Sequence, residues 1–193
     1  MLTRNRNPRY VRPVLSPSNL KWISEALPNL SSEIGGSVEF NKKGEFERYT
    51  VYTSSKRLAM ILPDFFAVEW HAHFDPYAIQ LPSLTDLRIA AKRKLGYDKK
   101  NMSVTGQLNI VFCLKGVVLY KFVGKKLHEK AIYERISAIM NEGADTVEGM
   151  NDQIRQIEKI SNFQYELISW ATALKRGVSL GRICLREFVS GPK

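Results

Sequence analysis

Two of the three histidines of this chain lie one residue apart, at the end of a stretch that is typical of a buried strand. Residues 65–73 are mostly apolar, and His71 and His73 close the stretch. Side chains two positions apart on a strand point to the same face. The chain is therefore expected to fold around a buried strand that presents both imidazoles to one point.

A carboxylate follows at the predicted start of the next helix. Asp86 lies thirteen residues after His73 and three after Ser83, and a helix is predicted over 83–95. Catalytic zinc sites combine three protein ligands with one water, and two histidines with an aspartate supply that number. The histidine pair and the pair of Ser83 with Asp86 each also have a purely structural explanation. Histidines in strands are often structural, and Ser83 with Asp86 has the spacing of a capping box.

Several metal-hydrolase families carry a His-x-His after a strand, and two of them do not fit. The run from His71 to Asp75 spells the H-x-H-x-D of metallo-β-lactamases, but Pro76 stands where the next histidine is needed and only His128 remains. Amidohydrolases need further histidines and a barrel of roughly 250 residues. The histidine count and the length of 193 residues argue against both families.

The run H-x-H, followed by Pro-Ser-x-x-Asp-Leu, resembles the JAMM motif of MPN-domain (JAB-type) zinc metalloproteases. Those proteins also carry an upstream glutamate on an early strand, followed by glycine and small or aliphatic residues. Residues 33–38, Glu-Ile-Gly-Gly-Ser-Val, have that pattern and begin 38 residues before His71. The resemblance covers about residues 16–125.

The chain departs from the family pattern in the loop after the second histidine. The family usually has proline directly after that histidine, whereas here Phe74 and Asp75 precede Pro76. The loop from 74 to 82 is also two residues longer than is usual in the family. Both differences concern the shape of the loop and leave the types of ligand unchanged.

The resemblance implies zinc-dependent hydrolysis of a peptide or isopeptide bond, of the kind that deubiquitinases carry out. It implies that His71, His73 and Asp86 bind Zn²⁺ and that a water fills the fourth position. It further implies that Glu33 takes a proton from that water and gives it to the leaving amine, and that Ser83 helps to hold the oxyanion. The partner would be a protein or peptide substrate, including a ubiquitin-like conjugate.

Four neighbours of the motif receive their own interpretation. Glu69 is expected on the same strand face as the histidines and can orient or replace a ligand, and Asp75 can reach the metal or the substrate from the longer loop. His128 is interpreted as a surface residue. The pair Gly35-Gly36 is interpreted as keeping the backbone clear beside the metal, because glycine in a strand often marks a close approach.

The order of predicted elements indicates an α/β (α+β) fold with a mixed β-sheet flanked by helices. The resemblance adds an MPN/cytidine-deaminase-like three-layer arrangement. Residues 1–15 are expected to form a basic arm, 16–125 the catalytic core, and 126–193 a helical extension that packs on the core and can bind a protein partner. The predicted elements are a helix at 17–27 with Ser16 as its N-cap, strands at 33–40 and 46–53, a short strand or helical turn at 58–62, the strand at 65–73, the helix at 83–95, a hairpin of 107–114 with 117–123, helices at 126–140 and 147–175, and a strand or short helix at 180–189.

The net charge of +10, from 29 Lys and Arg against 19 Asp and Glu, favours acidic partners. A nucleic-acid-binding protein is therefore one alternative function. The other is a non-catalytic MPN-type scaffold that binds a partner through the helical extension. The charge is dispersed, however, and its clusters are interpreted as a loose arm and solvated faces. The clusters are Arg4, Arg6, Arg9 and Arg12; Lys92-Arg93-Lys94 with Lys99 and Lys100; and Lys121, Lys125 and Lys126.

Cysteine use and hydropathy predict a cytoplasmic, reducing location without membrane contact. Cys113 and Cys184 lie far apart in apolar surroundings and are interpreted as buried free thiols, with a disulfide as the alternative. No apolar run approaches the roughly 20 residues that span a bilayer. The N-terminus has basic residues without an apolar region after them, so a secretory signal is not expected.

Overall fold

The computed structural model describes residues 10–52, 65–74, 80–96 and 108–184. Its centre is a six-stranded sheet with the order β4-β3-β5-β6-β7-β8. Neighbouring strands of this sheet are antiparallel except β5 and β6, which are parallel. The strands are β3 (Ile34–Asn41), β4 (Phe46–Tyr52), β5 (Phe65–His73), β6 (Asn109–Cys113), β7 (Gly116–Phe122) and β8 (Phe163–Ser169).

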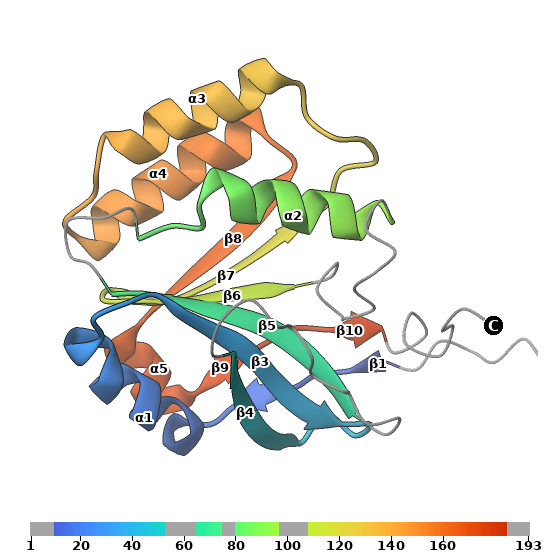
Figure 1. Ribbon diagram of the computed structural model, residues 1–193, viewed down its shortest axis with the longest axis vertical. Helices are drawn as coiled ribbons and strands as arrows, with labels where there is room; N and C mark the ends of the chain where they lie inside the picture. Colours follow the sequence, from blue (N-terminus) through green and yellow to red (C-terminus); the bar gives the residue numbers. More distant parts are fainter. Residues whose placement is uncertain (1–9, 53–64, 75–79, 97–107, 185–193) are drawn as a thin grey trace, which may run out of the picture.

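Helices cover both faces of the sheet, so the described part of the chain has three layers (Figure 1). One face carries α1 (Pro17–Ala26), which is followed by a 3-10 turn (Leu27–Asn29), and α5 (Trp170–Arg176). The opposite face carries α2 (Leu84–Lys94), α3 (Lys130–Asn141) and α4 (Val147–Ile160). The predicted mixed sheet flanked by helices is confirmed at this level.

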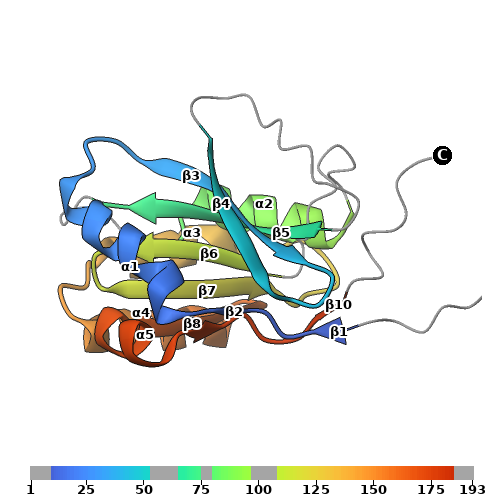
Figure 2. The same ribbon diagram turned by 90° about the horizontal axis from the view of Figure 1, so that it is seen from below.

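Two short strand pairs join the ends of the described chain. β1 (Tyr10–Val11) pairs with β10 (Ile183–Cys184), and β2 (Val14–Leu15) pairs with β9 (Val178–Ser179). Figure 2 shows these pairs beside the main sheet, on the side where α1 lies. The described end of the predicted arm is therefore extended but paired. β10, which lies within the predicted strand or short helix at 180–189, pairs with this arm. The predictions for residues 1–9, 58–62 and 185–189 lie outside the described residues.

β5 separates an apolar face from a polar one. Its even-numbered side chains, such as Val68 and Trp70, are buried in the core under α1. Its odd-numbered side chains Glu69, His71 and His73 point to the face that α2 covers, because successive side chains alternate across a strand. The apolar face anchors the strand, and so the position of both histidines is determined by packing behind them.

The predicted helix at 147–175 is wrong, because the chain leaves α4 at Ile160 and forms β8 before α5. β8 pairs with β7 along its whole length, from Phe122↔Phe163 to Gly116↔Ser169. The pairing supplies hydrogen-bond partners to the backbone N–H and C=O groups along one edge of β7, which would otherwise be unpaired. Residues from 126 onward thus supply a strand of the central sheet as well as helices.

Three further sequence predictions concern the cysteines, the basic cluster around Arg93 and membrane-spanning helices. Cys113 is buried and free, as expected, while the side chain of Cys184 lies outside the described part. Arg93 is buried, although its basic cluster was assigned to a solvated face; Lys92 and Lys94 on either side are exposed. Among the helices of the described residues, none combines the length and the apolar composition needed to cross a bilayer.

Gly36 is expected to be required for pairing of β3 with β4. A Cβ built on Gly36 would lie 1.7 Å from the carbonyl oxygen of Thr50, so the β4 backbone would have to move. We expect Gly36→Ala to lower the free energy of unfolding by about 1–3 kcal/mol, measured by urea denaturation. Gly149→Ala in α4 is the control. A Cβ there would lie 3.3 Å from Cβ of Ala144 and from Oγ1 of Thr146, which need to shift only slightly, and alanine favours the helix, so the net change should be under about 1 kcal/mol. Equal stability of Gly36→Ala and the parent chain would contradict the prediction.

Candidate metal centre

The two imidazoles lie together on one face of β5. Their ring centroids are 4.9 Å apart, with the ring planes tilted by 53°. The side chains of His71 and His73 are 20% and 10% exposed, so both are accessible from one side only. The prediction that the strand presents both imidazoles to one point is confirmed by this arrangement.

Glu33 reaches the imidazoles from the residue directly before β3. The β3–β5 register sets Gly35 opposite His71, which brings the start of β3 beside the end of β5. Oε1 of Glu33 lies 3.2 Å from Nε2 of His73, and the Glu33 side chain is 59% exposed. One ligand atom from each of Glu33, His71 and His73 lies within 4.8 Å of the other two, a spacing that a metal ion could bridge.

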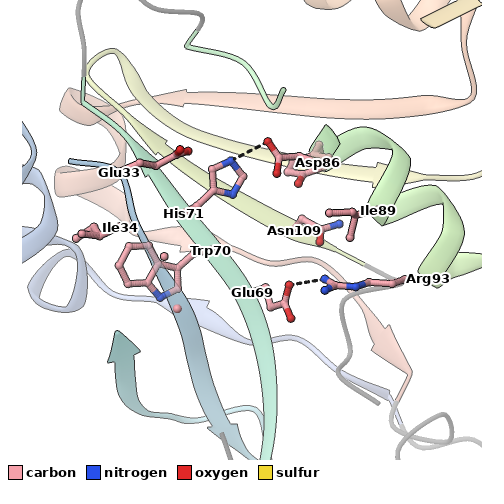
Figure 3. Close-up of a pocket in the computed structure, with 12 residues that line it drawn as sticks. Glu33, Ile34, Glu69, Trp70, His71, Asp86, Ile89, Arg93 and Asn109 are labelled. Atoms are coloured by element: carbon pink, nitrogen blue, oxygen red, sulfur yellow. Dashed lines mark hydrogen bonds and ion pairs between the residues drawn. The ribbon is translucent and has the colours of Figure 1, made fainter. Parts of the chain in front are cut away.

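Asp86 approaches His71 from the first turn of α2. Ser83 is the N-cap of this helix, and its backbone N–H and Oγ both donate to Oδ2 of Asp86, at 2.9 and 2.6 Å. Oδ2 of Asp86 also lies 3.3 Å from Nε2 of His71 (Figure 3). The hydrogen bonds of the capping box therefore also orient the carboxylate of Asp86 toward His71.

Asp86 is held in its ionised form. Burial alone would raise its pKa, but the interactions with His71 and the hydrogen bonds from Ser83 together outweigh burial and lower the pKa to about 2. The carboxylate is thus charged over the whole physiological range. Asp86 therefore offers an ionised carboxylate beside His71, whereas the described residues whose ligand atoms all lie within 4.8 Å of one another are Glu33, His71 and His73.

Two contacts in the cluster have the length expected between neighbouring zinc ligands. In tetrahedral sites with bonds of about 2.0–2.1 Å, neighbouring ligand atoms lie about 3.4 Å apart. The Glu33–His73 and His71–Asp86 contacts, at 3.2 and 3.3 Å, are close to that value. Nε2 of His71 is buried and has no hydrogen-bond partner in the described part of the chain, since its contact with Asp86 meets only the distance of an ion pair. In the neutral ring with its proton on Nδ1, this nitrogen would offer its lone pair to a metal.

Ser83 is positioned to orient Asp86. Its hydroxyl hydrogen is donated to Oδ2 of Asp86, while its oxygen accepts the N–H of Asp86 at 3.2 Å. In this arrangement the hydroxyl has no second hydrogen to give to an oxyanion. The role implied by the family resemblance would require the hydroxyl to turn away from Asp86.

A pocket of about 300 Å³ continues from the cluster along β5, beneath α2. Glu69, one of the alternative ligands, pairs there with Arg93 of α2 (Figure 3). Arg93, Asn109 and Tyr120 were not predicted as site residues, and the sequence signal for Arg93 was hidden in a run of basic residues. Burial raises the pKa of Tyr120 well above its usual value, and nearby Asp86 adds to the effect, so the phenol stays protonated.

The structure bears differently on the interpretations of Asp75, His128 and the Gly35-Gly36 pair. Asp75 lies outside the described residues. His128 is half-buried away from this pocket: it accepts the N–H of Asn162 at 2.9 Å and packs edge-on against Phe122. A Cβ on Gly35 would lie 3.1 Å from the carbonyl oxygen of Trp70 and 3.4 Å from Cβ of His71, so the tight neighbour is the backbone of β5 and the contact with His71 is an ordinary one. Gly36, in contrast, is needed for the approach of β4.

Comparisons of the chain with protein-family models, with curated proteins and with solved structures found no match in any of the three. What the site can do therefore has to follow from its own residues and their geometry.

Proposed function

We propose that this chain is a zinc-dependent hydrolase of JAMM type that cuts a peptide or isopeptide bond, with an MPN-like arrangement of its layers. The observation that carries the proposal is the convergence of two carboxylates on one imidazole pair, at 3.2 and 3.3 Å, from two separate elements. Either carboxylate alone would be an ordinary ion pair. Two of them, with a pocket beside them, form a ligand set together with a base.

The two carboxylates are given different roles. Metal ligands are usually oriented by hydrogen bonds from neighbouring groups, and Asp86 has such support from Ser83. Glu33 is the more exposed of the two and carries no such capping interaction within the described residues. We therefore assign His71, His73 and Asp86 as zinc ligands and Glu33 as the base. Among the described residues, the ligand atoms within 4.8 Å of one another are those of Glu33, His71 and His73, so this assignment requires Asp86 to move closer to His73 when the metal binds.

The proposed chemistry divides between metal and protein. The contribution of a bound zinc ion would be Lewis acidity, which lowers the pKa of a coordinated water to about 7. Glu33 accepts the proton of the attacking water and delivers it to the nitrogen of the leaving amine as the C–N bond breaks. Ser83 keeps Asp86 aimed at the centre, and α2 shields one side of the pocket from solvent.

The test is zinc content together with chelator-sensitive cleavage. We expect about one equivalent of zinc by elemental analysis, cleavage of di-ubiquitin or of members of a peptide panel, loss of cleavage with a chelator and recovery on adding zinc back. Cleavage that is insensitive to the chelator would contradict the metal mechanism. Zinc binding without cleavage of any substrate, or no zinc at all, would contradict the hydrolase, and the second result would favour the scaffold alternative.

A further inference from the structure

A buried arginine lies in the same pocket as the candidate metal centre. Arg93 comes from the last turn of α2, its side chain is 3% exposed, and its Nη1 contacts Oε2 of Glu69. Asn109 and Tyr120, which are also buried, line the same pocket. A charged side chain enclosed to this degree is unusual without partners for all its donors.

Two of the donors of Arg93 have no acceptor. Nε and Nη2 are buried, and neither has a hydrogen-bond partner in the part of the chain that the structure describes. The guanidinium cannot shed its charge, so these N–H groups cannot be neutralised by deprotonation. Nε and Nη2 belong to one edge of the planar fork, which can hold two oxygens of one carboxylate in parallel hydrogen bonds.

We propose that the Nε–Nη2 edge of Arg93 binds a carboxylate of the substrate. A neutral amide offers one oxygen, which meets both donors only in a poorer bifurcated geometry and brings no charge to the guanidinium. A phosphate carries more negative charge into a pocket that Glu69, Asp86 and Glu33 already line, and like charges repel more strongly away from bulk water. A single carboxylate satisfies both donors with the least repulsion.

The position of Arg93 limits where this carboxylate can be in the substrate. Its partner Glu69 lies two strand residues before His71, about 7 Å along β5, and Arg93 lies seven helical residues after Asp86, about 10 Å along α2. An extended peptide covers about 3.3–3.6 Å per residue. The carboxylate therefore belongs to an Asp or Glu side chain, or to a chain end, within about two to three residues of the bond that is cut; this inference rests on the proposed function.

The first test measures binding with the metal removed, so that a carboxylate cannot bind to zinc. The full chain is stripped of metal and titrated with N-acetyl-L-glutamate α-amide and with N-acetyl-L-glutamine α-amide, so that the side chain is the one group that differs and only the first compound carries a carboxylate, with binding followed by NMR. We expect the glutamate derivative to bind at least about tenfold more tightly than the glutamine derivative. Arg93→Lys, which keeps a cation beside Glu69, should reduce that preference by about tenfold because the fork is lost. Lys92→Gln, on the exposed side of the same helix, should leave it unchanged.

Equal binding of the two compounds by the parent chain would overturn the proposal, and so would an unchanged preference in Arg93→Lys. If the variant proves unstable by circular dichroism, equal binding of the two compounds by the parent chain still overturns the proposal. The second test applies to cleavage: peptides with Glu near the bond should exceed matched Gln peptides at least about tenfold in kcat/KM. If the chain prefers the carboxylate compound but binds no zinc and cleaves no substrate, the Arg93 site is supported and only the proposed hydrolase function is rejected.

Discussion

Glu33→Gln is expected to abolish turnover while zinc stays bound. The glutamine side chain has nearly the same shape but cannot accept the proton of the attacking water, and loss of a general base costs about 10²–10⁴-fold in rate. Zinc should remain because the assigned ligands, His71, His73 and Asp86, are unchanged. The measurements are kcat/KM on the best substrate of the peptide panel and zinc content by elemental analysis of the same preparation.

The control for this variant is Glu69→Gln, which removes a different carboxylate from the same pocket. Glu69 pairs with Arg93 and belongs to the pocket wall, so its loss should alter stability or substrate preference without removing proton transfer. Full activity of Glu33→Gln would show that Glu33 is not the base. Loss of zinc from Glu33→Gln would instead identify Glu33 as a ligand, which its spacing from the histidines also permits.

The strand at Phe163–Ser169 shows why a periodic pattern can mislead. Apolar residues continue at nearly helical spacing from α4 into this segment, and that continuity predicted one helix. The segment itself alternates, with Phe163, Tyr165 and Leu167 separated by Gln164 and Glu166. Ser161 and Asn162, both turn formers, stand between the two patterns. Residues 163–169 form a strand because they pair with the edge of β7. Pairing between segments that are distant in the chain cannot be predicted from local sequence.

One part of the candidate site could be predicted from the sequence and another part could not. The histidine pair followed from strand alternation, and Ser83 with Asp86 followed from capping rules, because both depend on neighbours close in sequence. The ion pair of Glu69 with Arg93 joins β5 to the far end of α2, 24 residues later. Local patterns contain no information on such a contact, so Arg93 was assigned to a solvated face with the lysines beside it.

Loss of zinc from His71→Ala and Asp86→Asn is the second large effect that we expect. Each change removes an assigned ligand, so zinc affinity should fall by more than about 100-fold, beyond the roughly 10–100-fold cost of losing a group that only orients a ligand. Ser83→Ala belongs to that smaller class: it removes one hydrogen bond to Asp86 and should weaken zinc binding by about 10–100-fold. Affinities are measured by competition with a chelating dye.

The three variants distinguish a metal site from a helix cap. If Ser83 and Asp86 served only as a capping box, both changes would cost about 0.5–2 kcal/mol of stability and would leave zinc affinity at the parent value. If the cap aims a ligand, the order of zinc affinities is parent, then Ser83→Ala, then Asp86→Asn. Ser16→Ala is the matched control, because it removes the equivalent cap of α1 on the opposite face of the sheet. It should lower stability alone, and any reversal of that order would refute the role of Asp86.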